Sequence, residues 1–342
     1  MPEFHSLALE LNLATFAVAA AVVWWAGTKL TAHADAIARI TGIGHAVVGM
    51  LLLGGITSLP EIAVSVTAGL RGSADFAVSN LLGGVALQVA IIAIGDALLG
   101  ERALTAQVPR PTVLLQAVFS CLLLALFAAA VLVGDVAVAG VGAWSLAIAL
   151  TGAAMFWIIS RNGDREPWQA TPAPKPEAPA ETADDPSLTR ALWMTGAMGA
   201  VVLVAGWALA GTGEAIAAQS GLGSSFVGAT LVGFATSLPE ISTVVAAVRI
   251  RRYTMAFADI FGTNVFDLML VLLIDAVAPG GPVLASQGPF AAFAAVLGIV
   301  VTLLYVAGLI ERRDRSYLRL GVDSWAVLIA YFGGAVALYG LR

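Results

Sequence analysis

Two glutamates interrupt long apolar stretches of this sequence. Glu61 follows Thr-Ser-Leu-Pro at residues 57–60, and Glu240 follows the same four residues at 236–239. A proline lacks the amide hydrogen and clashes with the carbonyl four residues back, so it kinks or breaks a helix at that point. Carbonyl groups freed in an apolar layer need another partner, and a hard cation that takes oxygen ligands is one. The pattern predicts a cation site.

Other oxygen donors stand at the same breaks, namely the hydroxyls of Thr57, Ser58, Thr236 and Ser237. An ionised side chain at mid-membrane depth costs at least about 2.5–3.5 kcal/mol and is normally functional. Apart from Lys29 and Arg190, which are end residues of two expected spans, no Lys or Arg lies within the spans to neutralise Glu61 and Glu240, so their partner is an ion, a proton or both. Because the pair is duplicated, we favour this interpretation over a protonated glutamate that bonds to a neighbouring helix.

Composition places these residues in a membrane protein. The chain has 342 residues, of which 59% are hydrophobic and 11% charged, with a formal net charge of −5. Soluble domains carry roughly 25% charged residues, so a soluble enzyme, a nucleic-acid-binding protein and a disordered scaffold are excluded. The single cysteine, Cys121, excludes an internal disulfide framework and a thiolate metal cluster.

A membrane-crossing helix needs about 20 mostly apolar residues. Windows of that width predict ten spans, at 7–29, 43–70, 75–99, 112–133, 136–160, 190–213, 223–248, 254–278, 288–310 and 322–341. Glu3 and Glu10 stand where a cleaved signal peptide would carry a basic segment, so the first span is expected to be retained. The proline-rich segment 161–189 is typical of a flexible linker and separates residues 1–160 from 190–342, with five spans in each half.

Basic residues predict the orientation. With the N-terminus outside, 15 of the 17 Lys and Arg residues fall in cytoplasmic loops, and Arg71 and Arg342 fall on the other side. Cytoplasmic loops carry the excess of basic residues in membrane proteins. We therefore expect both termini outside and the linker 161–189 in the cytoplasm. The expected location is an integral plasma membrane position, in a prokaryotic inner membrane.

The two halves repeat each other. Residues 49–62 read GMLLLGGITSLPEI and residues 228–241 read GATLVGFATSLPEI, an offset of 179 positions. Because each half has an odd number of spans, the second copy enters the membrane from the opposite face. Inverted repeats of this kind are typical of secondary transporters. The predicted fold is an all-α integral membrane protein of ten transmembrane helices, arranged as two inverted-topology five-helix repeats, with helices two and seven broken at the midplane.

The third and eighth spans carry a second polar set. Small or polar residues recur at every fourth position, on one helix face: Asn80, Gly84 and Gln88, then Asp259, Thr263 and Asp267. Asp267 is expected near the cation site. Asp259 lies roughly 12 Å from Asp267 along the axis of the eighth span, nearer the mouth of the site. Asp259 is either a cation ligand at that mouth or a solvated helix-end charge. Asp96 and Asp275, at the far ends of these spans, are favoured as interfacial caps.

The two TSLPE blocks resemble the α-repeats of the calcium/cation antiporter superfamily, whose best-known members are sodium/calcium exchangers. The family's second element, G-S-N-x-x-(N/D), is matched by GTNVFD at 262–267, and the resemblance covers both halves. It implies the ligand set Glu61, Glu240, Thr57, Ser58, Thr236, Ser237, Thr263 and Asp267, with backbone carbonyls of Gly54 and Gly233. The earlier copy, GGVALQ at 83–88, has Gly84 in place of the usual Ser and Gln88 in place of the usual Asn.

We therefore expect a secondary active antiporter that exchanges Ca²⁺ for Na⁺, with no cofactor and a complete site within one chain. Gly84 removes a side-chain oxygen and Gln88 keeps one on a longer arm, so coupling to H⁺, or transport of another divalent cation, is the alternative. A cation channel is the rival of another class. An intramembrane enzyme is disfavoured, since the spans contain no paired-aspartate pattern, HExxH or Ser-His pairing.

An antiporter and a channel differ in one measurement. Labelled Ca²⁺ leaving vesicles through an antiporter should be accelerated by unlabelled Ca²⁺ on the opposite side, because the site must be reoccupied to return. Channel flux would show no such trans-stimulation and no saturation, and that result would contradict the antiporter hypothesis.

Overall fold

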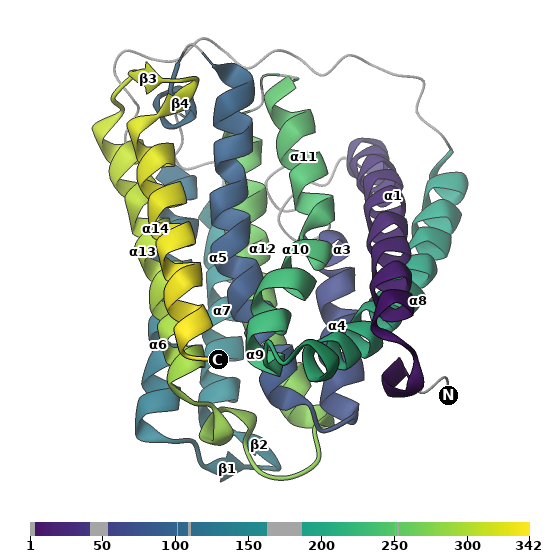
Figure 1. Ribbon diagram of the computed structural model, residues 1–342. Coiled ribbons are helices and arrows are strands. Elements are labelled where there is room, and N and C mark those ends of the chain that lie inside the picture. Colours follow the sequence, from purple (N-terminus) through teal and green to yellow (C-terminus); the bar gives the residue numbers. More distant parts are fainter. Residues whose placement is uncertain are drawn as a thin grey trace.

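The computed structural model describes residues 4–41, 54–100, 102–108, 111–162, 187–249, 251 and 253–342. Within these residues eight helices are long and apolar enough to cross a membrane. They are α1 (Leu9–Thr41), α5 (Ala74–Leu99), α6 (Pro111–Val133), α7 (Ala143–Asn162), α8 (Leu188–Ser220), α12 (Tyr253–Val277), α13 (Pro289–Glu311) and α14 (Val322–Gly340) (Figure 1). The chain is thus an all-α membrane protein, apart from two very short hairpins.

The TSLPE blocks interrupt helices. In the first half α3 (Gly54–Thr57) ends directly before Ser58, and α4 (Leu59–Leu70) begins directly after it. In the second half α9 (Ser224–Val227), the π-helical turn η4 (Gly228–Val232) and α10 (Gly233–Thr236) precede α11 (Leu238–Arg249). The axis bends by 44° between the segments before and after Ser237, and together they form a ninth candidate span. Residues 43–53, where the second span is expected to begin, lie outside the described residues.

Helices α1 and α8 are longer than the sequence predicts. Each has 33 residues, whereas the expected spans were 7–29 and 190–213. The hydropathy window ends where polar residues begin, but backbone hydrogen bonding continues until a residue breaks the helix. For α8 that residue is Gly221, whose φ of 70° places it in the left-handed region.

The expected start of the fifth span at residue 136 is wrong. Strands β1 (Ala137–Val138) and β2 (Val141–Gly142) form an antiparallel hairpin before α7. Strands β3 (Ser316–Tyr317) and β4 (Leu320–Gly321) form a second hairpin before α14. The turn between β1 and β2 has positive φ values at Ala139 (52°) and Gly140 (89°), which a right-handed helix cannot contain. An apolar window does not detect such a turn.

Corresponding elements recur along the chain. Each helix or strand from α1 to α7 has a counterpart that begins 178 or 179 residues later, between α8 and α14. The two hairpins lie at opposite ends of the molecule (Figure 1). Residues 163–186, most of the expected linker, lie outside the described residues, so the boundaries at 160 and 190 stay predictions.

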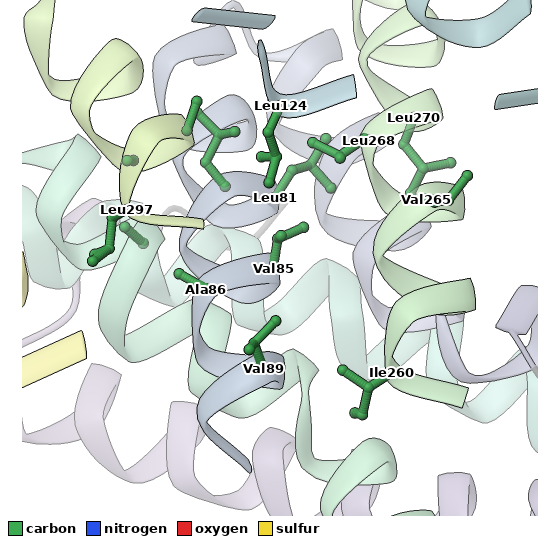
Figure 2. Close-up of a cluster of buried hydrophobic side chains, with 14 of the residues drawn as sticks. Leu81, Val85, Ala86, Val89, Leu124, Ile260, Val265, Leu268, Leu270 and Leu297 are labelled. Carbon is green, nitrogen blue, oxygen red and sulfur yellow. The ribbon is translucent and has the colours of Figure 1, made fainter. Parts of the chain in front are cut away.

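Helix α5 is at the centre of the bundle, since 89% of its apolar window is buried. Leu81, Val85 and Val89 on α5 belong to one hydrophobic cluster with residues of α6, α12 and α13, such as Leu124 and Val265 (Figure 2). Helices α1, α8 and α14 bury less than a third of theirs. Their exposed apolar side chains suit contact with lipid rather than water.

Two buried aspartates connect the halves. Asp96 accepts hydrogen bonds from the amide of the first residue of η3 (Leu104–Gln107) at 2.7 Å and of the last residue of β4 at 2.5 Å. Asp275 does the same for the first residue of η5 (Val283–Ser286) at 2.8 Å and the last residue of β2 at 2.5 Å. Each aspartate therefore joins a turn of its own half to the hairpin of the other half, which agrees with the capping role expected of them.

Helices α1 and α8 pack along each other and cross the segments that follow the breaks. A Cβ on Gly27 of α1 would stand 2.7 Å from Cγ of Pro239, and one on Gly206 of α8 would stand 2.4 Å from Cβ of Ala63. Both distances are too short for real contacts, so these crossings require glycine. The two glycines are at equivalent positions of the two halves.

The crossing at Gly206 can be tested with a matched pair of variants. Gly206→Ala should destabilise the protein by about 1–3 kcal/mol, because the added methyl group overpacks the contact with α4. Gly196→Ala on the same helix is the control: its Cβ would meet nothing within 4 Å. It should leave stability unchanged or raise it slightly, since Ala favours helix. Thermal unfolding in detergent measures both, and equal midpoints would contradict the close packing.

Candidate ion-binding site

The first break lies against α12 of the second half. Ser58 donates a hydrogen bond from Oγ to Oδ1 of Asp267 at 2.6 Å, and the hydroxyl oxygens of Thr57 and Thr263 are 3.5 Å apart. All four side chains are buried. The sequence placed these residues at one site by spacing and resemblance, and the structure brings these four together.

Asp267 is held from two sides. Its second oxygen, Oδ2, accepts a hydrogen bond from Nε2 of Gln88 on α5 at 3.1 Å. Gln88 and Asp267 are 179 residues apart, so residues at equivalent positions of the two halves meet each other. Oε1 of Gln88 is buried and has no hydrogen-bond partner among the described residues. The amide therefore presents a free oxygen beside a fixed carboxylate.

Glu61 and Glu240 stand in the first turns of α4 and α11. Both are buried, at 1% and 0% exposure, and none of their carboxylate oxygens has a hydrogen-bond partner among the described residues. The two carboxylates interact electrostatically with Asp267, and Glu61 also with Glu240. Each lies beside the TSLPE threonine of the other half, Glu61 by Thr236 and Glu240 by Thr57. Positive ends of helix dipoles favour negative charge at these positions.

Among the described residues, no Lys or Arg pairs with these carboxylates. The described ion pairs lie elsewhere: Arg71–Glu214, Arg102–Asp314 and Arg313–Glu311. Nor do three or more Asp, Glu, His or Cys side chains of the described segments gather closely enough to hold a metal ion by themselves. A cation here would need hydroxyl, amide and carbonyl oxygens as well as carboxylates, as Ca²⁺ and other hard cations accept.

The remaining predicted ligands are placed differently. Ser237 is buried at the second break, and its hydroxyl has no partner among the described residues. The carbonyl of Gly233 accepts hydrogen bonds from the Ser237 amide at 3.1 Å and the Thr236 hydroxyl at 3.3 Å. Gly54 is the first residue of α3, directly after residues that are not described.

Two polar residues of this region were not predicted. Asn264 is fully buried, and neither of its amide atoms has a partner among the described residues; its place inside the GTNVFD block was the available signal. Thr243 lies one helical turn after Glu240 and contacts Asp259. Asp259 itself is only 6% exposed, so its interpretation as a solvated helix-end charge is wrong.

A separate cleft of about 930 Å³ opens at one end of the molecule. Residues 72–76, parts of 214–224 and residues near 278–286 line it, and they include Asp75 and Glu214. None of the predicted ligands lines this cleft. The buried site is therefore distinct from the open cleft.

Comparison with known proteins identifies the fold and the family. The chain is similar to the inner membrane protein YrbG of Escherichia coli (strain K12), with 28% identity over 276 residues, which are 79% of this chain and 81% of that protein. It is similar to the protein named "Putative antiporter CaxA" of Alkalimonas amylolytica, with 24% identity over 322 residues, which are 92% of this chain and 94% of that protein.

Among solved structures, the sodium-calcium exchanger NCX_Mj soaked with Na⁺ and Sr²⁺ matches with a TM-score of 0.64 and 16% identity. The match covers 98% of this chain and 100% of that one, and it shows a shared fold. The family described as sodium/calcium exchanger protein matches residues 11–161 and 190–339. Since these ranges take in most of both halves, the chain belongs to the sodium/calcium exchanger protein family.

Proposed function

We propose that this protein is a secondary active antiporter that exchanges Ca²⁺ for Na⁺ across the membrane. The observation that carries the proposal is the pair Glu61 and Glu240: both are buried, and neither has a hydrogen-bond partner or basic partner among the described residues. Buried charges of this kind require compensation. Family membership supports cations as the compensating species.

The two glutamates neutralise one divalent cation. Hydroxyls of Thr57, Ser58, Thr236 and Ser237, the Thr263 hydroxyl, the Gln88 amide oxygen, the Asp267 carboxylate and the carbonyls of Gly54 and Gly233 complete the proposed ligand set. Several Na⁺ ions use the same oxygens in place of Ca²⁺. Because both ion types need the same carboxylates, they occupy the site in turn, and this competition produces exchange.

The proposed topology has ten spans in two inverted five-helix repeats, with spans two and seven broken at the midplane. The 179-residue recurrence of elements and the placement of the two hairpins at opposite ends support it. Both termini are outside and the linker 161–189 is cytoplasmic, as the basic residues predict. A prokaryotic inner membrane is the proposed location, supported by the name of the relative YrbG.

The carboxylates can be tested in proteoliposomes. Glu61→Gln and Glu240→Gln should each lower Na⁺-driven Ca²⁺ uptake at least about tenfold, since each removes a charge worth more than about 1.4 kcal/mol to a bound divalent ion. Glu214→Gln is the control, because Glu214 pairs with Arg71 near the open cleft and is expected to leave uptake within about twofold. Unchanged uptake in both site variants would contradict the proposal.

Coupling to H⁺ is the second candidate, and Gly84 favours it. Gly84 stands where Thr263 stands in the other half, so one hydroxyl of the site is missing. A Cβ at Gly84 would meet only the Ser237 hydroxyl oxygen within 4 Å, at 3.9 Å, so a serine fits there.

Gly84→Ser should lower the Na⁺ concentration that gives half-maximal exchange, by about threefold to tenfold, because it adds an oxygen ligand worth roughly 0.5–1.5 kcal/mol. The measurement is Ca²⁺ flux against Na⁺ concentration, with Gly196→Ala as the control for a helix substitution. Ca²⁺ uptake driven by a pH gradient without Na⁺, together with no response of Gly84→Ser to Na⁺, would instead establish the H⁺-coupled alternative.

A further inference from the structure

Asp259 has the features of an ion ligand outside the central ligand set. It lies on α12 and is buried, and its Oδ2 accepts a hydrogen bond from the Thr243 hydroxyl on α11. Its other oxygen, Oδ1, has no hydrogen-bond partner among the described residues. Both carboxylate oxygens of Glu240 are likewise buried and without a partner there, and the Glu240 and Asp259 carboxylates interact electrostatically.

This group lies between the central site and one end of the molecule. Thr243 is one turn beyond Glu240 on α11, and its hydroxyl also contacts the Glu240 carbonyl at 3.0 Å. Helix α11 ends at Arg249, and α12 begins at Tyr253. Asp259 is therefore about 9 Å along the α12 axis from this turn. Arg249 ends α11 and Arg251 lies in this turn, and both are among the basic residues that predict a cytoplasmic face.

The other half lacks this arrangement. At the equivalent positions, 179 residues earlier, Val64 stands in place of Thr243 and Asn80 in place of Asp259, and both are fully buried. A hydrophobic and an amide side chain thus suffice for packing between α4 and α5. The carboxylate and hydroxyl between α11 and α12 go beyond what packing requires. They also make the two ends of the molecule chemically different.

We infer that Asp259, Thr243 and Glu240 form a second cation position, which holds Ca²⁺ between the central site and the end of the molecule at residues 249–253. The inference rests on the proposed function. Two carboxylates balance the charge of one divalent ion, and a hydroxyl is an accepted Ca²⁺ ligand type. Glu240 is shared by both positions, so an ion moves from Asp259 to the central site while it keeps one ligand.

The test is the sidedness of Ca²⁺ affinity. Asp259→Asn keeps an oxygen that accepts the Thr243 hydrogen bond but removes the charge. In proteoliposomes of known orientation, it should raise the Ca²⁺ concentration for half-maximal exchange about tenfold when Ca²⁺ is supplied from the 249–253 end. From the other end, affinity should stay within about twofold of wild type. Thr243→Val should raise the Ca²⁺ concentration for half-maximal exchange about threefold from the 249–253 end. Thr243→Ser, which keeps the hydroxyl, should leave that concentration at the wild-type value.

Asp75→Asn is the matched control, since Asp75 is an acidic residue at the opposite end, where its Oδ1 accepts a hydrogen bond from Gln287. It should not alter affinity from the 249–253 end. Two results would overturn the inference: Asp259→Asn has the same Ca²⁺ affinity as wild type from both ends, or it loses Ca²⁺ affinity equally from both ends. In either case, exchange by the wild type would still support the proposed function. If wild type exchanges no Ca²⁺, the proposed function itself fails.

Discussion

A carboxylate buried among apolar helices must be compensated, and this constraint organises the site. The positive end of a helix dipole is equivalent to about half an elementary charge, so the N-termini of α4 and α11 only partly balance Glu61 and Glu240. Among the described residues, no Lys or Arg supplies the rest. On the proposed function, the remaining charge comes from a cation that binds and leaves, which is the condition an exchanger needs.

Such a site requires surroundings that do not collapse onto it. Ser58 and Gln88 occupy the two oxygens of Asp267 and hold that carboxylate in place. The backbone comes very close at Gly83, where a Cβ would be 2.1 Å from the Ala229 carbonyl oxygen. This contact sets α5 directly against η4, next to the second break. These contacts hold the groups around the two glutamates, whose oxygens have no hydrogen-bond partner among the described residues.

The two halves share their element order but not their chemistry. The carboxylates Glu240, Asp259 and Asp267 all belong to the second half, whereas the first half contributes Glu61. Gln88 and Asn80 occupy the positions equivalent to Asp267 and Asp259. Three of these four buried carboxylates therefore come from one half of the sequence. On the proposed function, this difference lets two halves of similar architecture treat ions from the two ends differently.

Hydropathy and repetition were enough to predict most helices, because apolar content depends on residues close together in the chain. The ligand roles of Glu61 and Glu240 and the midplane position of the TSLPE breaks stay predictions. The same local logic missed the continuation of α1 and α8 and the two hairpins, where hydrogen bonding and positive φ values, rather than apolar content, determine the conformation.

Only the tertiary structure decided the contacts between residues that are distant in the sequence. How the helices cross decides three sets of contacts. They are the hydrogen bond from Gln88 to Asp267, the hydrogen bonds that Asp96 and Asp275 accept from the other half, and the contact of Thr243 with Asp259. Spacing along the sequence places a side chain on a helix face, but it does not say which helix that face meets. The sequence by itself therefore placed Glu61 and Glu240 within long apolar segments, but it left the burial of Asp259 open. The packing of α4, α5, α11 and α12 determined which buried carboxylate oxygens have hydrogen-bond partners among the described residues, because those partners come from other helices.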